Sequence, residues 1–349
     1  MRGPRGASLI ELMLALGLGV LVAAGAARLF ADSQRTYRLL HGQTRMQESA
    51  RQALDFIARS VRNAGYLGCR SSGITVRNTL NGAWGDMFEI DVTEPVEAFD
   101  GTDAHGSVDS WVPSLERFPA RGSRNVFVRG RGIDPGAVLP LTDVLVLRRL
   151  ATPGARIAEM VEPDGFPLVE DEGDLAIETG DFAVISDCRQ AALFRVTRME
   201  REEGVATLVR GPGAGPFDNA AGVSLSAAGT PYGSPFGPEG AAVFGVVTEI
   251  YFVARGTGRN NVGSAPASLW RKTTIDAPVE LIQGIDDLQL RLGLDGNGDG
   301  AVDLYALPGA AAGLDVRSVE VRVTANSVDA IDGTEPMRRT LSRVIAVRN

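Results

Sequence analysis

One acidic residue stands near the start of a long apolar stretch in the N-terminal part of the chain. From Ala7 to Ala27 the sequence runs for 21 residues without a proline and with a single charged side chain, Glu11. A helix of about 20 apolar residues can cross the hydrocarbon core of a bilayer. An unpaired carboxylate at that depth costs on the order of several kcal/mol. We therefore predict a membrane-spanning helix in which Glu11 has a cationic partner.

A short basic segment precedes the apolar stretch and can provide that partner. The first six residues contain two arginines. Cleavage after Gly6 would create an amino group on Ala7, beside Glu11 of this chain or of a neighbour. An ordinary secretory signal is disfavoured because no small-x-small cleavage site follows the apolar segment, so the helix would be retained. The alternative is a plain single-pass anchor.

The order Gly6-Ala7-Ser8-Leu9-Ile10-Glu11 before an apolar run resembles the class III signal of type IV prepilins. In that family a prepilin peptidase cuts after the glycine and methylates the new N-terminus, and the glutamate at mature position five docks the subunit. The resemblance implies that residues 1–6 are a leader, that cleavage falls between Gly6 and Ala7, and that Glu11 is the docking carboxylate. Ala7 stands where the family usually has phenylalanine.

The residues after the apolar run continue the helix with a different surface. Apolar residues recur there every three or four positions, which is the spacing of one helix face. They are Met46, Ala50, Ala53, Leu54, Ile57, Val61 and Ala64. Asp55 and Arg59 have the spacing of an ion pair on the other face, and Gly65 is placed as a C-terminal cap. We predict one helix of about 55 to 60 residues, with a membrane or filament-core part at 7–29 and an amphipathic part at 30–67.

Beyond the helix the pattern changes to short strands and loops. Runs rich in β-branched residues alternate with clusters of Gly, Pro and Asp. The predicted strands are Phe88–Val92, Asp143–Leu150, Asp181–Ser186, Ala192–Met199, Val205–Val209, Val243–Ala254, Leu281–Leu294, Arg317–Ala325 and Thr340–Val347. We predict long loops at residues 93–136 and 211–240. The expected fold class is α+β and type IV pilin-like: the long helix packs on a large, mostly antiparallel β domain formed by residues 68–349.

Several later segments resemble the PilW-type minor pilins. They are Gln47–Arg59, Arg62–Cys69, Gly180–Cys188, Thr248–Ala254 and Leu281–Asp303. The resemblance implies a structural subunit of the minor-pilin complex, which primes assembly of a type IV pilus and sits at its tip. The subunit would first lie in the inner membrane with its C-terminal domain in the periplasm, and would then enter the pilus.

The same resemblance implies a set of partners. They are other minor pilins, the major pilin, the prepilin peptidase, the inner-membrane assembly platform and a large tip adhesin. A net charge of -8 argues against nucleic acid as a direct partner. Two alternatives stay open: a minor pseudopilin of a type II secretion system, which shares the leader and the anchor, and a surface adhesion module tuned by calcium.

Two cysteines, Cys69 and Cys188, are too few for a zinc cluster and suit one disulfide. A domain that is moved across a bacterial membrane meets an oxidising compartment, where such a bridge persists. The alternative is a pair of buried free thiols.

One loop has the oxygen side chains of a calcium site. Within residues 295–303 these side chains fall at loop positions one, three, five and nine: Asp295, Asn297, Asp299 and Asp303. With Gly300 at position six, they match the first part of a calcium-binding loop. Position twelve, where a bidentate glutamate is expected, is Ala306. The sequence therefore predicts Ca2+ as the candidate cofactor, and the alternative is a hairpin of Asx turns without metal.

Sequence motifs for catalysis are absent. The two histidines, His41 and His105, stand in no nucleophile or zinc motif. The only lysine, Lys272, is not preceded by the glycines of a phosphate loop, and the glycine-rich run 211–215 is followed by a proline. We therefore predict a structural subunit and not an enzyme.

Overall fold

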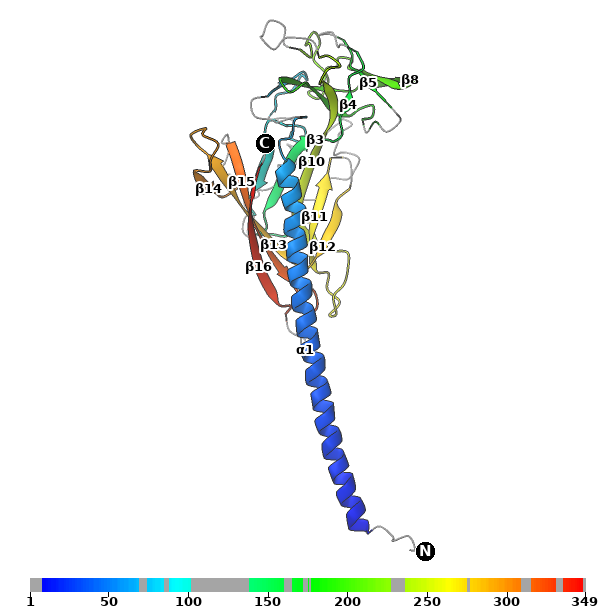
Figure 1. Ribbon diagram of the computed structural model, residues 1–349, viewed down its shortest axis with the longest axis vertical. Coiled ribbons are helices and arrows are strands. Elements are labelled where there is room, and N and C mark those ends of the chain that lie inside the picture. The colour runs from blue at the N-terminus through cyan, green and yellow to red at the C-terminus, as the bar shows by residue number, and fades with distance from the viewer. Residues whose placement is uncertain are drawn as a thin grey trace.

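The chain forms a long helix whose C-terminal half carries a β-rich domain, while its N-terminal half projects away from that domain. Figure 1 shows this arrangement in the computed structural model. The structure describes residues 8–68, 74–84, 88–101, 138–159, 165–171, 175, 177–226, 236–274, 277–308, 315–330 and 335–347. One long N-terminal helix and a large β-rich C-terminal region agree with the predicted α+β class.

Helix α1 spans Leu9–Asn63 without interruption and contains 55 residues. All seven residues of the predicted apolar stripe are buried against the β domain. The helix ends at the position expected from the sequence, because Gly65 has a φ of 74°. This left-handed conformation favours glycine directly after a helix.

The strands occupy most of the described residues after the helix. They are β1 (Thr75–Asn78), β2 (Val96–Phe99), β3 (Val144–Leu150), β4 (Ala155–Arg156), β5 (Leu168–Glu170), β6 (Phe182–Ser186), β7 (Gln190–Arg195), β8 (Arg198–Glu202), β9 (Val205–Val209), β10 (Ala242–Arg255), β11 (Ala267–Thr273), β12 (Val279–Gln283), β13 (Ile285–Asp295), β14 (Leu304–Ala306), β15 (Asp315–Asn326) and β16 (Arg338–Ala346). Among these strands the pairings are antiparallel except for β1 with β7, as a mostly antiparallel domain requires.

Strand β10 connects two parts of the largest sheet. Its residues 242–245 pair with β6 and its residues 246–251 pair with β3. The order of strands along this sheet is β1-β7-β6-β10-β11-β12, and β2 joins at β3. Two further sheets have the orders β14-β13-β15-β16 and β5-β9-β8.

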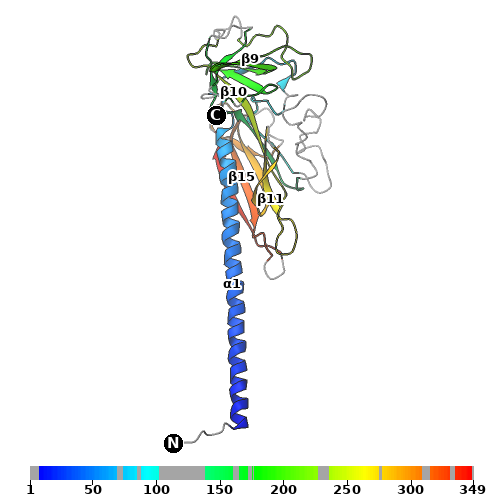
Figure 2. The ribbon, with the colours of Figure 1, turned by 90° about the vertical axis from the view of Figure 1, so that its right-hand side faces the viewer.

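The C-terminal half of α1 lies against the four-stranded sheet and the adjoining part of the largest sheet (Figure 2). One apolar core joins the helix to both sheets, and its members include residues of α1, β10, β13, β15 and β16. Ile57, Tyr251, Leu288 and Val321 are all fully buried in it. This burial of apolar side chains holds the amphipathic half of α1 in place, because helix propensity alone contributes little to its stability.

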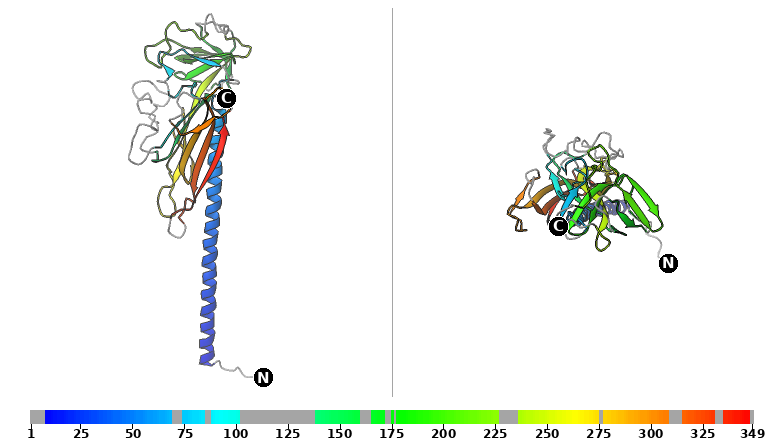
Figure 3. Two further views of the ribbon diagram at one scale, coloured as in Figure 1. Left: turned by 90° about the vertical axis from the view of Figure 1, so that its left-hand side faces the viewer. Right: turned by 90° about the horizontal axis from the view of Figure 1, so that it is seen from above.

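A second apolar core lies beyond the C-terminal end of α1, where Figure 1 shows β4, β5 and β8. Figure 3 shows the same region from the left-hand side of that view and from above. Val169, Phe194 and Leu208 are fully buried there. Strand β10 contributes to both cores, because Val243 belongs to this one and Val253 to the core under α1. We call the region around the second core the head.

Two of the predicted strands are each divided in two. Leu281–Leu294 contains β12 and β13, which are separated because Gly284 has a φ of 81° and turns the chain. Ala192–Met199 is divided at Thr197, whose N–H donates to the carbonyl of Val209 at 2.8 Å. The chain there leaves the large sheet and enters the three-stranded sheet of the head.

The prediction of a strand at Phe88–Val92 is wrong. The segment is a buried turn, and side chains take the place of a strand partner. Arg148 on β3 is only 1% exposed, and its guanidinium donates to the carbonyls of Phe88 and Glu94, both at 2.7 Å. It also pairs with Glu97 at 2.7 Å. Because this side chain satisfies the carbonyl groups, the segment packs without joining a sheet.

Candidate functional site

The free half of α1 holds most of the exposed large apolar side chains among the described residues. Every residue from Leu9 to His41 is exposed, and Gly42 is the first buried position of the helix. Leu9 is 76% exposed and Leu21 is 70% exposed. An 18-residue window here has a mean hydropathy of 2.2. A continuous apolar surface of this kind marks contact with a membrane or with other proteins.

The length of the free half fits a membrane with a spacer above it. The apolar part from Leu9 to Ala27 is 19 residues long, which gives about 28 Å of helix against a hydrocarbon core of about 30 Å. The part from Arg28 to His41 adds about 21 Å and carries Arg28, Asp32, Arg35 and Arg38. The β domain therefore meets the helix beyond the headgroup layer of a bilayer that surrounds the apolar part.

Glu11 lies in the first turn of α1, three residues after the N-cap Ser8. This is the spacing of a capping box, but Ser8 makes no side-chain cap bond. Its carbonyl accepts the N–H groups of Glu11 at 3.0 Å and Leu12 at 3.1 Å. The part of the chain that the structure describes offers the Glu11 carboxylate no hydrogen bond or ion pair. The positive end of the helix dipole favours a negative charge at this place.

The two predicted processing residues, Gly6 and Ala7, lie outside the described residues, and so does Cys69. Cys188 lies in the turn between β6 and β7 with a φ of 71°. Gly68 lies beside this turn, because a Cβ atom on Gly68 would be 3.5 Å from the Cβ of Ser186. The residue before one cysteine is thus close to the turn that holds the other. This proximity supports the bridge, which stays a prediction.

The predicted calcium loop connects β13 to β14. Asp295 faces inward and accepts N–H groups from Gly298 at 2.7 Å and Gly300 at 2.8 Å. The Nε of Arg317 lies 3.2 Å from the same carboxylate. Burial alone raises the pKa of Asp295, but the two N–H bonds and the Arg317 guanidinium outweigh it and hold the pKa below its usual range.

The other three predicted ligands lie close together at the exposed side of this loop. The Nδ2 of Asn297 is 3.2 Å from the carboxylate of Asp299 and 3.4 Å from that of Asp303. Asn297 and Asp299 each accept the backbone N–H two residues later, as in Asx turns. Asp303 accepts the N–H of Gly296 at 2.8 Å. Groups of three or more His, Cys, Asp or Glu suited to a metal are absent from the described ranges. The geometry thus contains the Asx turns of the alternative, and calcium binding stays a prediction.

A buried carboxyl group, that of Glu89, lies near Arg148. The sequence analysis did not identify it. Glu89 is 4% exposed, and one of its carboxyl oxygens has no hydrogen-bond partner. Burial raises its pKa to about 9, although Lys272 and Arg148 lower it in part. Glu89 is therefore neutral at pH 7. The available signal was indirect: Arg148 and Lys272 both stand in strands whose other residues are largely apolar or small.

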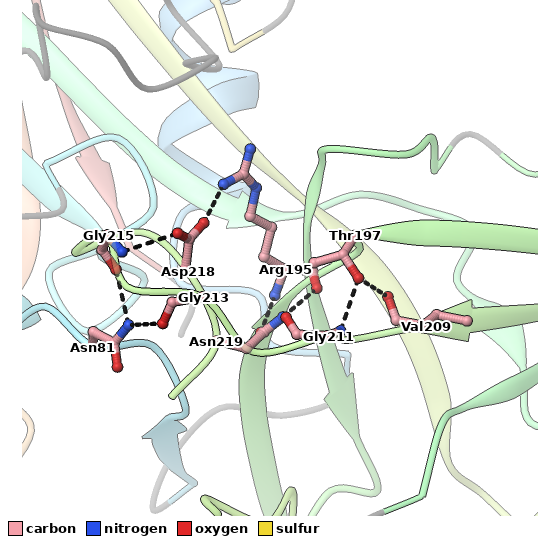
Figure 4. Close-up of polar contacts among 9 residues, drawn as sticks. All are labelled: Asn81, Arg195, Thr197, Val209, Gly211, Gly213, Gly215, Asp218 and Asn219. Atoms are coloured by element: carbon pink, nitrogen blue, oxygen red, sulfur yellow. Dashed lines mark hydrogen bonds and ion pairs between the residues drawn. The ribbon is translucent and has the colours of Figure 1, made fainter. Parts of the chain in front are cut away.

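The first part of the predicted loop 211–240 is held in place by side chains (Figure 4). Asp218 accepts the N–H of Gly215 at 3.0 Å and a guanidinium N–H of Arg195 at 2.6 Å. Asn219 is 1% exposed and exchanges two hydrogen bonds of 2.8 Å with the backbone of Arg195. Asn81 donates to two carbonyls of the loop. The glycine-rich run is therefore a braced loop on the end of β7.

The comparisons with known proteins add no relative to this description. No protein-family model matches the chain, and neither the curated proteins nor the solved structures contain a match.

The candidate site is the free half of α1, with Glu11 in its first turn. It places one carboxylate on an otherwise apolar, exposed helix surface.

Proposed function

We propose that this chain is a minor pilin of a type IV pilus, a membrane-anchored structural subunit that primes assembly and takes a place at the pilus tip. The observation that carries the proposal is the free half of α1. A helix that is exposed from Leu9 to His41 and has one acid in its apolar part needs a lipid or protein environment with a matching cation.

Removal of the first six residues creates that cation. The new amino group is on Ala7, two positions before α1 begins in the sequence, and we infer that it pairs with Glu11 of a neighbouring subunit. In a medium of low dielectric constant such a pair attracts far more strongly than in water. The helix can then leave the lipid for a bundle of similar helices, because both environments cover its apolar surface, while the β domain stays outside.

The position of the head supports a place at the tip. The head lies beyond the C-terminal end of α1, on the side away from the free half of the helix (Figure 1). A subunit stacked above this one would meet the head, whereas a subunit below would meet the free helix. Cryo-imaging of labelled protein would test this, and an even spacing along the shaft would contradict it.

Two measurements test the assembly role. Mass spectrometry of the protein from cells is expected to show an N-terminus at Ala7, and a protein that still begins at Met1 contradicts the proposal. Glu11→Ala and Glu11→Gln are expected to be cleaved but not incorporated into pili, while Glu11→Asp keeps part of the incorporation. Asp32→Asn serves as the control, because Asp32 is an exposed acid on the same helix outside the apolar part. Normal incorporation of Glu11→Ala would rule out docking through this residue.

A further inference from the structure

The free half of α1 carries a seven-residue repeat of uncharged residues along one side. With the positions of the repeat labelled a to g and Leu9 placed at a, positions a and d are Leu9, Leu12, Leu16, Gly19, Ala23, Ala26, Phe30, Ser33, Tyr37 and Leu40. Apart from Ser33, each of them is apolar or aromatic. A repeat of this kind, sustained from Leu9 to Leu40, is the pattern of a helix that packs along a second helix. We call these residues the seam.

The charged residues of the free half all lie off the seam. Glu11 and Asp32 fall at position c, Arg28 and Arg35 at f, and Arg38 at b. Positions e and g flank the contact in a pair of helices, and their charges select the partner. Between the two ends of the seam these positions carry no charge. The seam can therefore face an identical seam without bringing like charges together.

The β domain leaves the seam open. Each residue advances the helix by about 100°, which places Tyr37 about 180° from Met46 and Leu40 about 160° from Gly42. Gly42 and Met46 are the first two buried positions of the helix. Figures 2 and 3 show the β domain on one side of α1. The upper part of the seam thus lies on the side away from the domain.

A bilayer covers only the lower part of the seam. From Leu9 to Leu40 the seam is about 46 Å long, against a hydrocarbon core of about 30 Å. Its three large residues beyond the apolar part, Phe30, Tyr37 and Leu40, are 67%, 66% and 58% exposed. Above the lipid these side chains stay in water unless a protein surface covers them.

The seam ends where the β domain begins. Above the free half, the exposed side of α1 is charged and carries Glu48, Arg51 and Asp55. Asp55 pairs with Arg343 of β16 at 2.7 Å, in place of the predicted pair with Arg59. The uncharged surface is thus confined to the half of the helix that the domain does not use.

A second copy of the chain fits the seam. Two anchors of one sequence that cross the same membrane run parallel, and a two-fold axis along the helices then places each seam residue against its own counterpart. A Cβ atom on Gly19 would meet nothing within 4 Å, so two backbones can approach closely at this point. Above the lipid, the hydroxyl of Ser33 faces the same hydroxyl of the partner and can form a hydrogen bond with it.

We propose that the seam pairs two copies of this chain as parallel helices, and that the contact continues above the lipid through Phe30, Tyr37 and Leu40. The inference rests on the proposed function for the common direction of the anchors. It extends that function by giving the subunit a surface for self-association. Docking through Glu11 uses another side of the helix, because Glu11 falls at position c.

Disulfide crosslinking of the full-length protein in its own membrane tests the pairing. In a parallel pair that is in register, identical positions meet only along the seam, so a single added cysteine reports the contact. The variants are Ser33→Cys and Tyr37→Cys on the seam, with Asp32→Cys and Arg38→Cys beside them as matched controls. The wild type, treated with the same oxidant, reports the contribution of the two native cysteines.

We expect the two seam variants to form a dimer of twice the chain mass about tenfold faster than the two controls, because a disulfide requires Cβ atoms within about 4.5 Å of each other. Adding Tyr37→Glu to the Ser33→Cys protein is expected to slow crosslinking about tenfold, since two carboxylates then face each other across the seam. Adding Arg38→Glu instead, which places the same charge off the seam, leaves the rate unchanged.

Three results would overturn the inference: no dimer in the seam variants, equal rates on and off the seam, or an adduct in which mass spectrometry finds a different chain. Crosslinking that is insensitive to Tyr37→Glu would overturn it as well. The proposed function is judged separately, by an N-terminus at Ala7 and by the incorporation of Glu11→Ala into pili. A failure of the seam therefore leaves the proposed function standing.

Discussion

The hydroxyl groups of Ser60 on α1 and Tyr251 on β10 lie 2.8 Å apart and are both buried, although 191 positions separate them in the sequence. Burial and the nearby Glu249 raise the pKa of Tyr251, while its bond to Ser60 acts in the opposite direction. This hydrogen bond ties the helix to the largest sheet at one defined position inside the apolar core.

We expect Tyr251→Phe to lower the free energy of unfolding by about 1–3 kcal/mol, because the Ser60 hydroxyl is left buried without a partner. Ser60→Ala has a smaller effect, because the Tyr251 hydroxyl also has a hydrogen bond with the side chain of Arg271. The double variant loses less than the sum of the two, since no unpaired hydroxyl remains. Urea unfolding of the three variants measures this, and strictly additive losses would show that the two hydroxyls do not interact.

Glu89 makes stability depend on pH. Its pKa is raised from 4.5 to about 9 in the folded protein, so between these values the folded state holds a proton that the unfolded state has released. Stability therefore falls as the pH rises through this range, by up to about 1.4 kcal/mol for each pH unit. Glu89→Gln lacks this loss, and its advantage over the wild type grows from pH 5 to pH 8 in unfolding experiments.

The control for Glu89 is Glu200→Gln on the exposed strand β8, which we expect to be neutral at both pH values. An advantage of Glu89→Gln that is the same at pH 5 and pH 8 would mean that Glu89 is ionised in the folded protein.

Calcium binding at the β13–β14 loop is tested by thermal melting with Ca2+ and with Mg2+ at equal ionic strength. Extracellular calcium modules bind with a Kd of about 10⁻⁴–10⁻³ M. Ca2+ at tenfold to hundredfold over Kd adds roughly 1.4–2.7 kcal/mol of stability. The double variant Asp299→Asn with Asp303→Asn keeps the Asx turns and is expected to lose the response. Calorimetry that finds no heat of Ca2+ binding to the wild type would leave the loop as a plain hairpin.

A bridge between Cys69 and Cys188 closes a loop of 119 residues, which the chain-entropy model values at up to about 5 kcal/mol. Cys69→Ser, Cys188→Ser and the double variant are then expected to lower the melting temperature by the same amount, because each removes the same bond. Reduction of the wild type gives the same shift. Two single variants with separate, additive effects would indicate free thiols.

The helix was predictable because its signals are local and repeated. The apolar stripe from Met46 to Ala64 has helical spacing, and all of its members are buried. Glu11 could be singled out for the same reason, because one acid in an apolar run stands out without any knowledge of the fold. The apolar residues of the free half of α1 are exposed, and this is an observation that the sequence alone could not provide.

The pairing of the strands was not predictable from the residues. Strand β11 contains Arg271 and Lys272 and does not read as a strand, yet it pairs with β10 over its full length. Arg148 replaces a strand partner for the segment at Phe88, and this depends on contacts between residues about 60 positions apart. The place of β16 at the edge of its sheet is likewise a property of the strand order and not of its sequence.

The continuity of β10 determines how tension would pass through the molecule. A pull on the head travels along this strand into the sheet that grips the helix, and from there to the anchor. The strand's hydrogen bonds to β3 and β11 lie across the direction of that pull. They would have to break together in shear, whereas a bond row loaded from one end unzips one step at a time. The head and the sheet that packs on the helix are thus joined through one continuous strand.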